Sequence, residues 1–262
     1  MNTIEVRNLI KRYQDRAVLD GINLSIKKGE TFVIMGGSGC GKSTLLRHLI
    51  GSEKPDNGEI FINEKNITAM PQKELDELRK KIGILYQSGA LLNSLTVGEN
   101  IALPLVEHTK LAPDIIEIII KMKLELVGLT GFENLKPAEL SGGMKKRVGL
   151  ARAIAMDPEI VFYDEPGAGL DPVVTGVIDK LIKDLSQKLN ITSIVVTHEM
   201  TSAFRIADRM AMLYNGKVVQ VGTPSEIKNS ANPIVQQFIT GSPDGPIPLR
   251  RSGDEYLKIL SG

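Results

Sequence analysis

The chain has 262 residues, of which 42 % are hydrophobic and 24 % are charged, so it can build one large or two small globular domains. A net charge of +1 and the absence of Trp argue against bulk electrostatic capture of nucleic acid and against a base-stacking surface. The single cysteine, Cys40, excludes an internal disulfide framework, and no run of about 18 apolar residues predicts a membrane span.

The first third of the chain predicts strands joined by turns, with two helices between them. Alternating or short apolar runs bounded by Gly, Asn and Lys are typical of strands, and a charged stretch with leucines on one face is typical of a surface helix. Strands are expected over 3–9, 21–26, 29–37, 58–63 and 82–86. Helices are expected over 41–50 and 72–81.

The stretch GGSGCGKST matches the phosphate-loop pattern G-x-x-x-x-G-K-[ST], with an apolar strand before it and a helix after it. Glycines allow backbone N–H groups to close around a phosphate chain, and the helix directs its positive end at the same anion. Lys42 is expected to reach the β- and γ-phosphates, and Ser43 to offer its hydroxyl to Mg²⁺. The residues expected to contact ATP here are Gly36, Gly37, Ser38, Gly39, Cys40, Gly41, Lys42, Ser43 and Thr44.

Cys40 lies inside this loop, beside Lys42 and a helix N-terminus, and both neighbours favour a thiolate. The sequence therefore predicts a thiol that is alkylated readily in the empty protein and protected by ATP. An inert loop cysteine is the alternative, and the sequence does not decide between the two.

From Ser88 to Ala155 the pattern indicates only helices, including one over 113–127. Its isoleucine-rich stretch, 115–120, is interpreted as a buried helix face in a bundle, with a membrane contact as the alternative. From Glu159 onward strands and helices alternate again, which predicts a parallel sheet with helices on its faces. The helical stretch is thus an insertion into an α/β core.

Two acidic residues follow the apolar run 160–163, which is expected to be a central strand. Ligands of open α/β sheets bind at this end of the strands. Asp164 is therefore expected to hold Mg²⁺, and Glu165 to be the base that polarises an attacking water. Asp171 precedes a proline and predicts a helix N-cap. His198 follows a second apolar strand and is expected near the γ-phosphate, a structural histidine being the alternative.

Taken in order, these motifs resemble those of the ATP-binding subunit of an ABC transporter, over about residues 3–228. The resemblance implies that Gln87 is the glutamine of the Q-loop and a further Mg²⁺ ligand. It also implies that Asp171 lies in the D-loop and contacts ATP, that His198 is the switch histidine, and that Tyr13 stacks on adenine. The implied catalytic residues are Glu165, His198, Lys42 and Gln87, acting on ATP with Mg²⁺.

The resemblance explains the turn formed by Ser141, Gly142 and Gly143 in LSGGM, the signature motif. A hydroxyl and free backbone N–H groups at a helix start make an anion site. In the family, two subunits pack head to tail, and each signature closes on the γ-phosphate held by the other. A homodimer is therefore implied. The following Lys145, Lys146 and Arg147 are interpreted as a solvated helix face rather than a nucleic-acid patch.

The fold implied is α/β: a P-loop NTPase of the ABC type, with a mixed sheet core, an N-terminal antiparallel β subdomain and a helical insertion. The expected boundaries are an ATPase domain over 1–240, containing a helical subdomain at about 88–155, and a tail over 241–262 for dimer or partner contact.

Met144 stands where most family members carry Gln, and LSGGMKKRVGLARA resembles the branch that works with lipid-transport permeases and MCE-domain proteins, the Mla phospholipid system. The tail QQFITGSPDGPIP also resembles the C-terminal ending of that branch. Gly167 departs from the usual Thr or Ser, with an expected effect on the hydrolysis rate. The branch implies a permease contact at 87–100, where ALLNSL is either partner surface or local core.

The branch also implies an MCE-domain partner, a small STAS-type regulator that the tail binds unless it crosses to the other subunit, and a location on the cytoplasmic face of the inner membrane. The alternatives are an ABC ATPase for another solute and a soluble ABC protein acting on ribosomes or DNA. The balanced charge argues against a nucleic-acid partner. Neither the direction of transport nor the lipid head group follows from the sequence.

Overall fold

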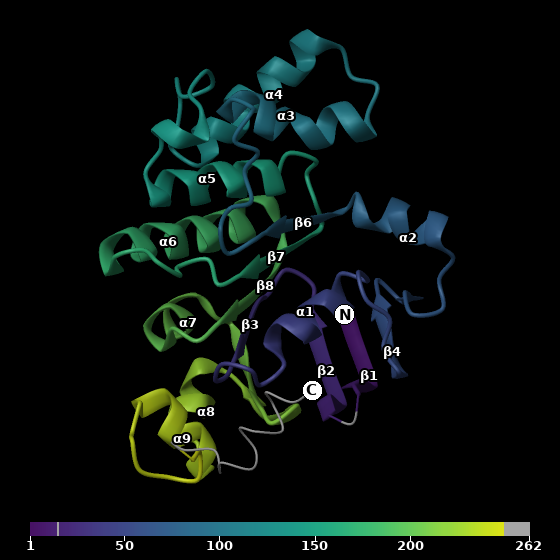
Figure 1. The fold of residues 1–262 in the computed structure, drawn as a ribbon, viewed down its shortest axis with the longest axis vertical. Helices are drawn as coiled ribbons and strands as arrows, with labels where there is room; N and C mark the ends of the chain where they lie inside the picture. Colours follow the sequence, from purple (N-terminus) through teal and green to yellow (C-terminus); the bar gives the residue numbers. More distant parts are fainter. Residues whose placement is uncertain (15, 249–262) are drawn as a thin grey trace.

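A computed structural model describes residues 1–14 and 16–248 (Figure 1). The strands are β1 Asn2–Tyr13, β2 Arg16–Lys27, β3 Thr31–Met35, β4 Asn57–Ile62, β5 Lys65–Asn66, β6 Ile82–Leu85, β7 Ile160–Asp164, β8 Thr192–Thr197, β9 Arg209–Tyr214 and β10 Lys217–Gly222. The helices are α1 Lys42–Leu49, α2 Gln72–Arg79, α3 Val97–His108, α4 Pro113–Leu126, α5 Gly142–Ala153, α6 Pro172–Leu189, α7 Met200–Ile206, α8 Pro224–Lys228 and α9 Pro233–Thr240, with a 3₁₀ turn η1 at Pro137–Glu139.

The strands form two sheets. The N-terminal sheet is antiparallel, with strand order β2-β1-β4-β5. The second sheet has the order β10-β9-β3-β8-β7-β6. Its strands β9, β3, β8, β7 and β6 run parallel, and only the edge strand β10 is antiparallel. The predicted parallel sheet is confirmed, and β10 is an element that the sequence pattern did not predict.

The six-stranded sheet has a hydrophobic core on each face. Every residue of β3 and β8 is buried, as expected for strands covered on both sides. Successive side chains of β3 alternate between the cores: Val33 packs into the larger cluster, under the helices, and Phe32 into the smaller one, against α1 and the N-terminal sheet. The sheet therefore joins the two halves of the molecule.

The helical insertion forms a separate layer, seen at the top of Figure 1, in which α3, α4 and α5 pack against one another. The interpretation of the isoleucine-rich stretch as a buried face is only half right. Ile116, Ile119 and Ile120 pack against the larger core, but Ile115, Ile118 and Met122 are 40 %, 53 % and 56 % exposed and share one face of α4. Within residues 1–14 and 16–248, no helix is long and apolar enough to cross a membrane.

The C-terminal region contains two short helices, α8 and α9, which the Pro- and Gly-rich sequence did not predict. Thr223 and Glu226 form a capping box that starts α8, and Gly241 ends α9 in the left-handed conformation. The chain then folds back, because the buried Gln237 side chain hydrogen-bonds both the N–H (2.6 Å) and the carbonyl (3.1 Å) of Ile247. Most of the predicted tail, residues 249–262, lies outside the described residues.

Candidate nucleotide-binding site

Four predicted motifs follow the carboxyl ends of four neighbouring parallel strands. The phosphate loop follows β3, His198 follows β8, Asp164 and Glu165 stand at the end of β7, and Gln87 comes two residues after β6. The strands lie in the order β3-β8-β7-β6 and are in register, with Met35 opposite Thr197 and Leu85 opposite Tyr163. The sheet therefore brings all four motifs to one edge, as expected for an open α/β fold.

The phosphate loop wraps closely around the start of α1. Gly41 has φ +107°, and a β-carbon there would lie 2.8 Å from the Val18 carbonyl oxygen; one at Gly36 would collide with the Leu213 carbonyl. Lys42 is buried, and its Nζ donates to the carbonyls of Gly36 (2.7 Å) and Gly37 (3.0 Å). The loop borders a cavity of about 240 Å³, lined by Arg16, Val18, Gly39, Gly41, Lys42, Ser43 and Thr44. A helix N-terminus and two cationic side chains make it suitable for an anion.

The expectation of a reactive Cys40 thiolate is wrong. Cys40 is only 9 % exposed and packs in the smaller core. Burial raises the pKa of its thiol above the usual value, although Lys42 acts in the opposite direction. Burial and the raised pKa of the thiol therefore favour the inert alternative.

We expect iodoacetamide to alkylate Cys40 at neutral pH at least about tenfold more slowly in the native, nucleotide-free chain than in the urea-unfolded chain, because little thiolate is present or accessible. Mass spectrometry of timed samples measures both rates. Equal rates for the native and unfolded chains would show that the loop opens freely and that the thiol is exposed.

Glu165 and His198 form a direct contact. His198 Nδ1 lies 2.9 Å from Glu165 Oε1, and the His198 backbone N–H donates to Oε2 at 3.4 Å. Glu165 is a non-glycine residue with φ +48°, a sparsely populated conformation. Burial and the adjacent Glu165 raise the pKa of Asp164 above its ordinary value, while Lys42 acts to lower it. Carboxylate charge is thus concentrated beside the phosphate loop, where a cation would be stabilised.

Gln87 is exposed, and the backbone of the segment that follows it is hydrogen-bonded by a side chain of α5. Arg152, at the end of α5, donates to the carbonyls of Gly89 (2.9 Å) and Ala90 (2.8 Å). The next residues, in the stretch ALLNSL, divide between core and surface. Leu91 packs against the larger core, whereas Leu92 is 46 % exposed.

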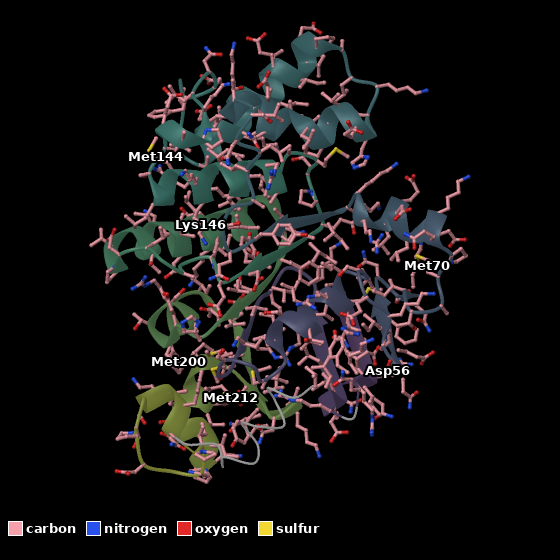
Figure 2. All side chains as sticks on the ribbon, viewed as in Figure 1. Asp56, Met70, Met144, Lys146, Met200 and Met212 are labelled. Carbon is pink, nitrogen blue, oxygen red and sulfur yellow. The ribbon has the colours of Figure 1, made fainter. Side chains whose placement is uncertain are left out.

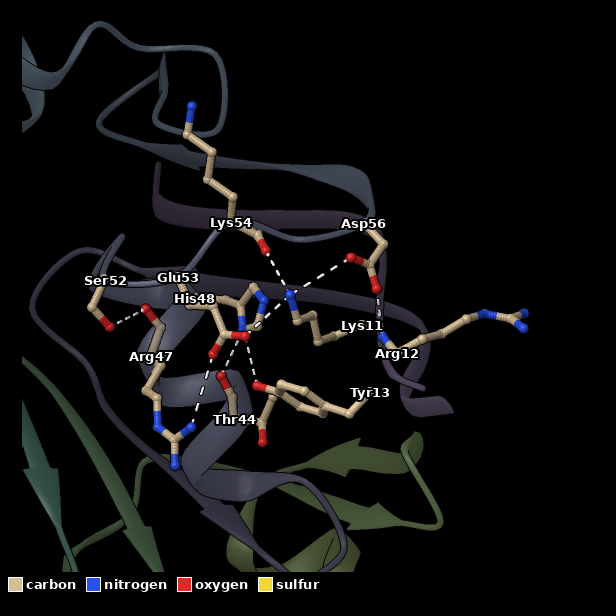
Figure 3. Close-up of polar contacts among 10 residues, drawn as sticks. All are labelled: Lys11, Arg12, Tyr13, Thr44, Arg47, His48, Ser52, Glu53, Lys54 and Asp56. Carbon is tan, nitrogen blue, oxygen red and sulfur yellow. Dashed lines mark hydrogen bonds and ion pairs between the residues drawn. The ribbon is translucent and has the colours of Figure 1, made fainter. Parts of the chain in front are cut away.

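Tyr13 ends β1 and takes part in a polar network shown in Figure 3. Its hydroxyl donates to Glu53 (2.6 Å), and Lys11 lies 5.3 Å from the ring centroid while pairing with Glu53 (3.1 Å) and Asp56 (3.6 Å). Burial raises the pKa of Glu53, but these hydrogen bonds outweigh it and hold the pKa below its ordinary value. The bond to Glu53 orients the ring of Tyr13. Because Tyr13 is 41 % exposed, the ring is still accessible to a nucleobase.

The Ser141 turn caps α5, as Ser141 Oγ accepts the Met144 N–H at 3.3 Å. A β-carbon at Gly143 would lie 2.5 Å from Val174, so this turn packs against the start of α6, which Asp171 caps by accepting from Val173 and Val174. Met144 lies at the outer edge of the helical layer in Figure 2, and α1 lies in the lower half of the molecule in Figure 1. The fold therefore does not bring the Ser141 turn to the phosphate loop of its own chain.

The interpretation of Lys145, Lys146 and Arg147 as a solvated face fails for two of the three. Arg147 donates to the carbonyls of Val127 and Gly128, which end α4. Lys146 is 5 % exposed, and its Nζ donates to the Glu165 carbonyl at 3.2 Å. Sequence reasoning missed this residue, although its spacing from the buried Gly143 and Leu150 places all three on one face.

The glycine at position 167 has a steric explanation. A β-carbon there would lie 2.8 Å from Thr175 Cγ2 and 3.0 Å from Glu199 Oε2. These two side chains occupy the space that the side chain of Thr or Ser would need. The effect of Gly167 on the hydrolysis rate stays a prediction.

A family model described as ABC transporter matches residues 19–168. The chain belongs to the ABC transporter family. It is 44 % identical, over 99 % of its own length and 98 % of the relative's, to the intermembrane phospholipid transport system ATP-binding protein MlaF of Haemophilus influenzae. It is 42 % identical, over 96 % of its own length and 73 % of the relative's, to the probable ribonucleotide transport ATP-binding protein mkl of Mycobacterium leprae.

Among solved structures, the chain resembles an ATP-binding cassette captured as a dimer in a post-hydrolysis state with ADP and Pi. The TM-score is 0.78 at 33 % identity, over 84 % of this chain and 98 % of the other. The fold predicted for an ABC-type P-loop NTPase is confirmed. As a member of the ABC transporter family, the chain is an ATP-binding and ATP-hydrolysing subunit.

Proposed function

We propose that this ABC subunit drives the transport of phospholipid, or of a closely related lipid, between membranes. The observation that supports this best is the 44 % identity, over nearly the full length of both chains, to a protein named for intermembrane phospholipid transport. The relative named for ribonucleotide transport is covered over only 73 % of its length. Transport of another solute is the second candidate because that relative is almost equally identical.

The proposed chemistry is attack of water on the γ-phosphate of ATP. Lys42 binds the phosphates from the loop, and Glu165 takes up the proton of the attacking water while His198 holds its carboxylate, a role that their 2.9 Å contact supports. Such phosphoryl transfer depends mainly on positioning and charge neutralisation, which groups at one sheet edge can supply. Tyr13 stacks on the adenine.

Mg²⁺ is proposed to be held by Ser43, Gln87 and Asp164. A hydroxyl, an amide and a carboxylate are oxygen ligands of the type that Mg²⁺ prefers. No group of three or more His, Cys, Asp or Glu that could hold a metal occurs in the described ranges, so these residues would need the nucleotide's phosphates to complete the shell. Bound there, the ion would neutralise phosphate charge.

The active unit is proposed to be a head-to-tail homodimer. Ser141, Gly142 and Gly143 of one chain close on the γ-phosphate bound by the partner's loop, and Asp171 of the D-loop lies beside them. The separation of the turn from the phosphate loop within one chain supports this arrangement, as does the dimeric state of the similar cassette.

The remaining partners are proposed to be membrane proteins, not nucleic acid. An integral-membrane permease would contact the region from Gln87 to Asn100, where Leu92 is exposed, and would hold the ATPase on the cytoplasmic face of the membrane. An MCE-domain lipid-binding protein and a small STAS-type regulator complete the proposed assembly, with the segment 241–262 as a dimer or regulator contact. The relationship to a phospholipid transport ATPase supports this set.

The test is affinity purification of the tagged full chain from detergent-solubilised native membranes, followed by mass spectrometry of proteins and lipids. We expect a multi-span permease, an MCE-domain protein and phospholipid. The same tagged chain purified from the soluble fraction is the control and should lack them.

A permease with a soluble solute receptor and no lipid-binding partner would overturn the lipid substrate and favour the second candidate. Ribosomes or DNA-repair factors without any membrane protein would overturn transport itself. Either result would leave the ATP chemistry unchanged, because that chemistry resides in this chain.

A further inference from the structure

Lys146 is a buried cation that the proposed chemistry does not use. It is 5 % exposed, and among the described residues its side chain makes one hydrogen bond, to the backbone carbonyl of Glu165. Burial lowers the pKa of its ammonium, and Asp164, Glu165 and Glu199 act to raise it. A buried charge is unfavourable unless it is paired or hydrogen-bonded, so this location requires an explanation.

The bond from Lys146 completes a clamp on the backbone of Glu165. The Glu165 N–H donates to the Val196 carbonyl of β8 at 2.9 Å, and its own carbonyl accepts both the Ala168 N–H at 3.1 Å and the Lys146 Nζ at 3.2 Å. The residue held by these bonds has φ +48°. Such a conformation persists only where the surroundings impose it, and here a strand, a local turn and the side chain of a helix residue do so.

The helix that carries Lys146 begins at the signature turn. Figure 2 shows Met144 and Lys146 on the same helix, α5, with Lys146 on the side toward α6. The two residues are less than one helical turn apart, so a displacement of the turn is transmitted to Lys146 through rigid backbone. Near its other end, α5 holds the segment after Gln87 through Arg152.

We infer that Lys146 is a positioning residue that couples the signature turn of a chain to that chain's own Glu165. When a partner's ATP occupies the Ser141 turn, α5 settles in one position, and Lys146 holds the Glu165 carbonyl so that its side chain faces the attacking water. This regulation rests on the proposed roles of Glu165 and the signature turn. It makes hydrolysis in one site depend on occupancy of the other.

The test compares Lys146→Met, which keeps the length and removes the donor, with Lys146→Arg, which keeps a cationic donor. Lys145→Met is the matched control, because Lys145 is the preceding residue of α5 and is not among its buried residues. In the described part of the chain, the Lys145 side chain forms no hydrogen bond or ion pair. Each full-length variant is assayed with its membrane partners for kcat and KM of ATP hydrolysis. ATP-driven dimerisation is measured by light scattering in a Glu165→Gln background, and melting temperature reports folding.

We expect Lys146→Met to lower kcat about 10- to 100-fold, with KM and dimerisation within about twofold of the parent, because a misplaced group affects the reacting geometry more than binding. Lys146→Arg should recover most of kcat, and Lys145→Met should match the parent. A normal kcat in Lys146→Met would overturn the inference, as would a parallel loss of kcat, dimerisation and melting temperature, which marks a structural role. Unchanged turnover in the Glu165→Gln parent would instead overturn the proposed base.

Discussion

Replacing Glu165 with Gln is expected to leave ATP binding intact and to lower steady-state turnover by about 10³-fold, the effect of removing a general base. The amide preserves the shape of the side chain and can still contact His198, but it cannot accept a proton from water. The dimer should therefore stay closed around unhydrolysed ATP. Phosphate release measures turnover, and size-exclusion chromatography with ATP measures the trapped dimer.

The matched control for this experiment is Glu159→Gln. Glu159 lies just before β7, at the opposite end of the strand from Glu165, where it pairs with Lys81. Exposed pairs of this kind contribute little, so turnover should stay within about twofold of the parent. If the Glu165 variant kept more than about a tenth of the parental rate, Glu165 could not be the base.

Replacing Ser141 with Arg should abolish hydrolysis while leaving ATP binding by the monomer unchanged. The substitution removes the cap of α5, which costs about 1 kcal/mol, and places a bulky side chain where a partner's phosphate would approach. The packing of Gly143 against α6 and the bond from Lys146 should keep the helix in place. Equilibrium binding of a fluorescent ATP analogue and phosphate release measure the two effects.

Mixing this variant with Lys42→Ala tests whether the site is shared between chains. Each variant alone should be inactive. In a mixed dimer, one site combines an intact phosphate loop from the first chain with an intact signature from the second. Random pairing leaves about a quarter of the sites complete, so ATP-driven dimerisation should reappear on mixing, whereas hydrolysis should stay low because the Glu165 of that site belongs to the chain with the altered Ser141 turn. Failure of ATP to bring the two variants together would contradict the head-to-tail arrangement.

The sequence could predict those parts of the site that follow from strand order. Each of these motifs follows an apolar run: the phosphate loop Gly36–Thr44, the pair Asp164 and Glu165, and His198. Parallel strands bring their carboxyl ends to one edge of the sheet. The N-cap at Asp171 was also predicted, because it depends only on neighbouring residues.

What the sequence could not predict depends on distant packing. The pKa of Cys40 is raised because the loop is buried in the core beneath the N-terminal sheet, which local charge does not reveal. Lys146 looked like one of three solvated cations; its helical spacing places it on the buried face of α5, but its contact with Glu165, which follows β7, is visible only in the folded chain. The isoleucines of α4 divide between core and surface because an apolar run does not specify how many of its faces find a partner.

The two cores on either side of the six-stranded sheet imply an uneven resistance to local opening. The amide hydrogens of β3 and β8 lie in strands whose residues are all buried, with a core above and below. Exchange of these hydrogens with solvent requires both cores to separate, whereas those of α4, with its exposed face, require only the edge of the helical layer to loosen. Hydrogen–deuterium exchange should therefore be slowest in these two strands. The phosphate loop and His198 thus follow the strands with the highest expected free energy of local opening. The signature turn belongs to the helical layer, where that free energy is expected to be lower.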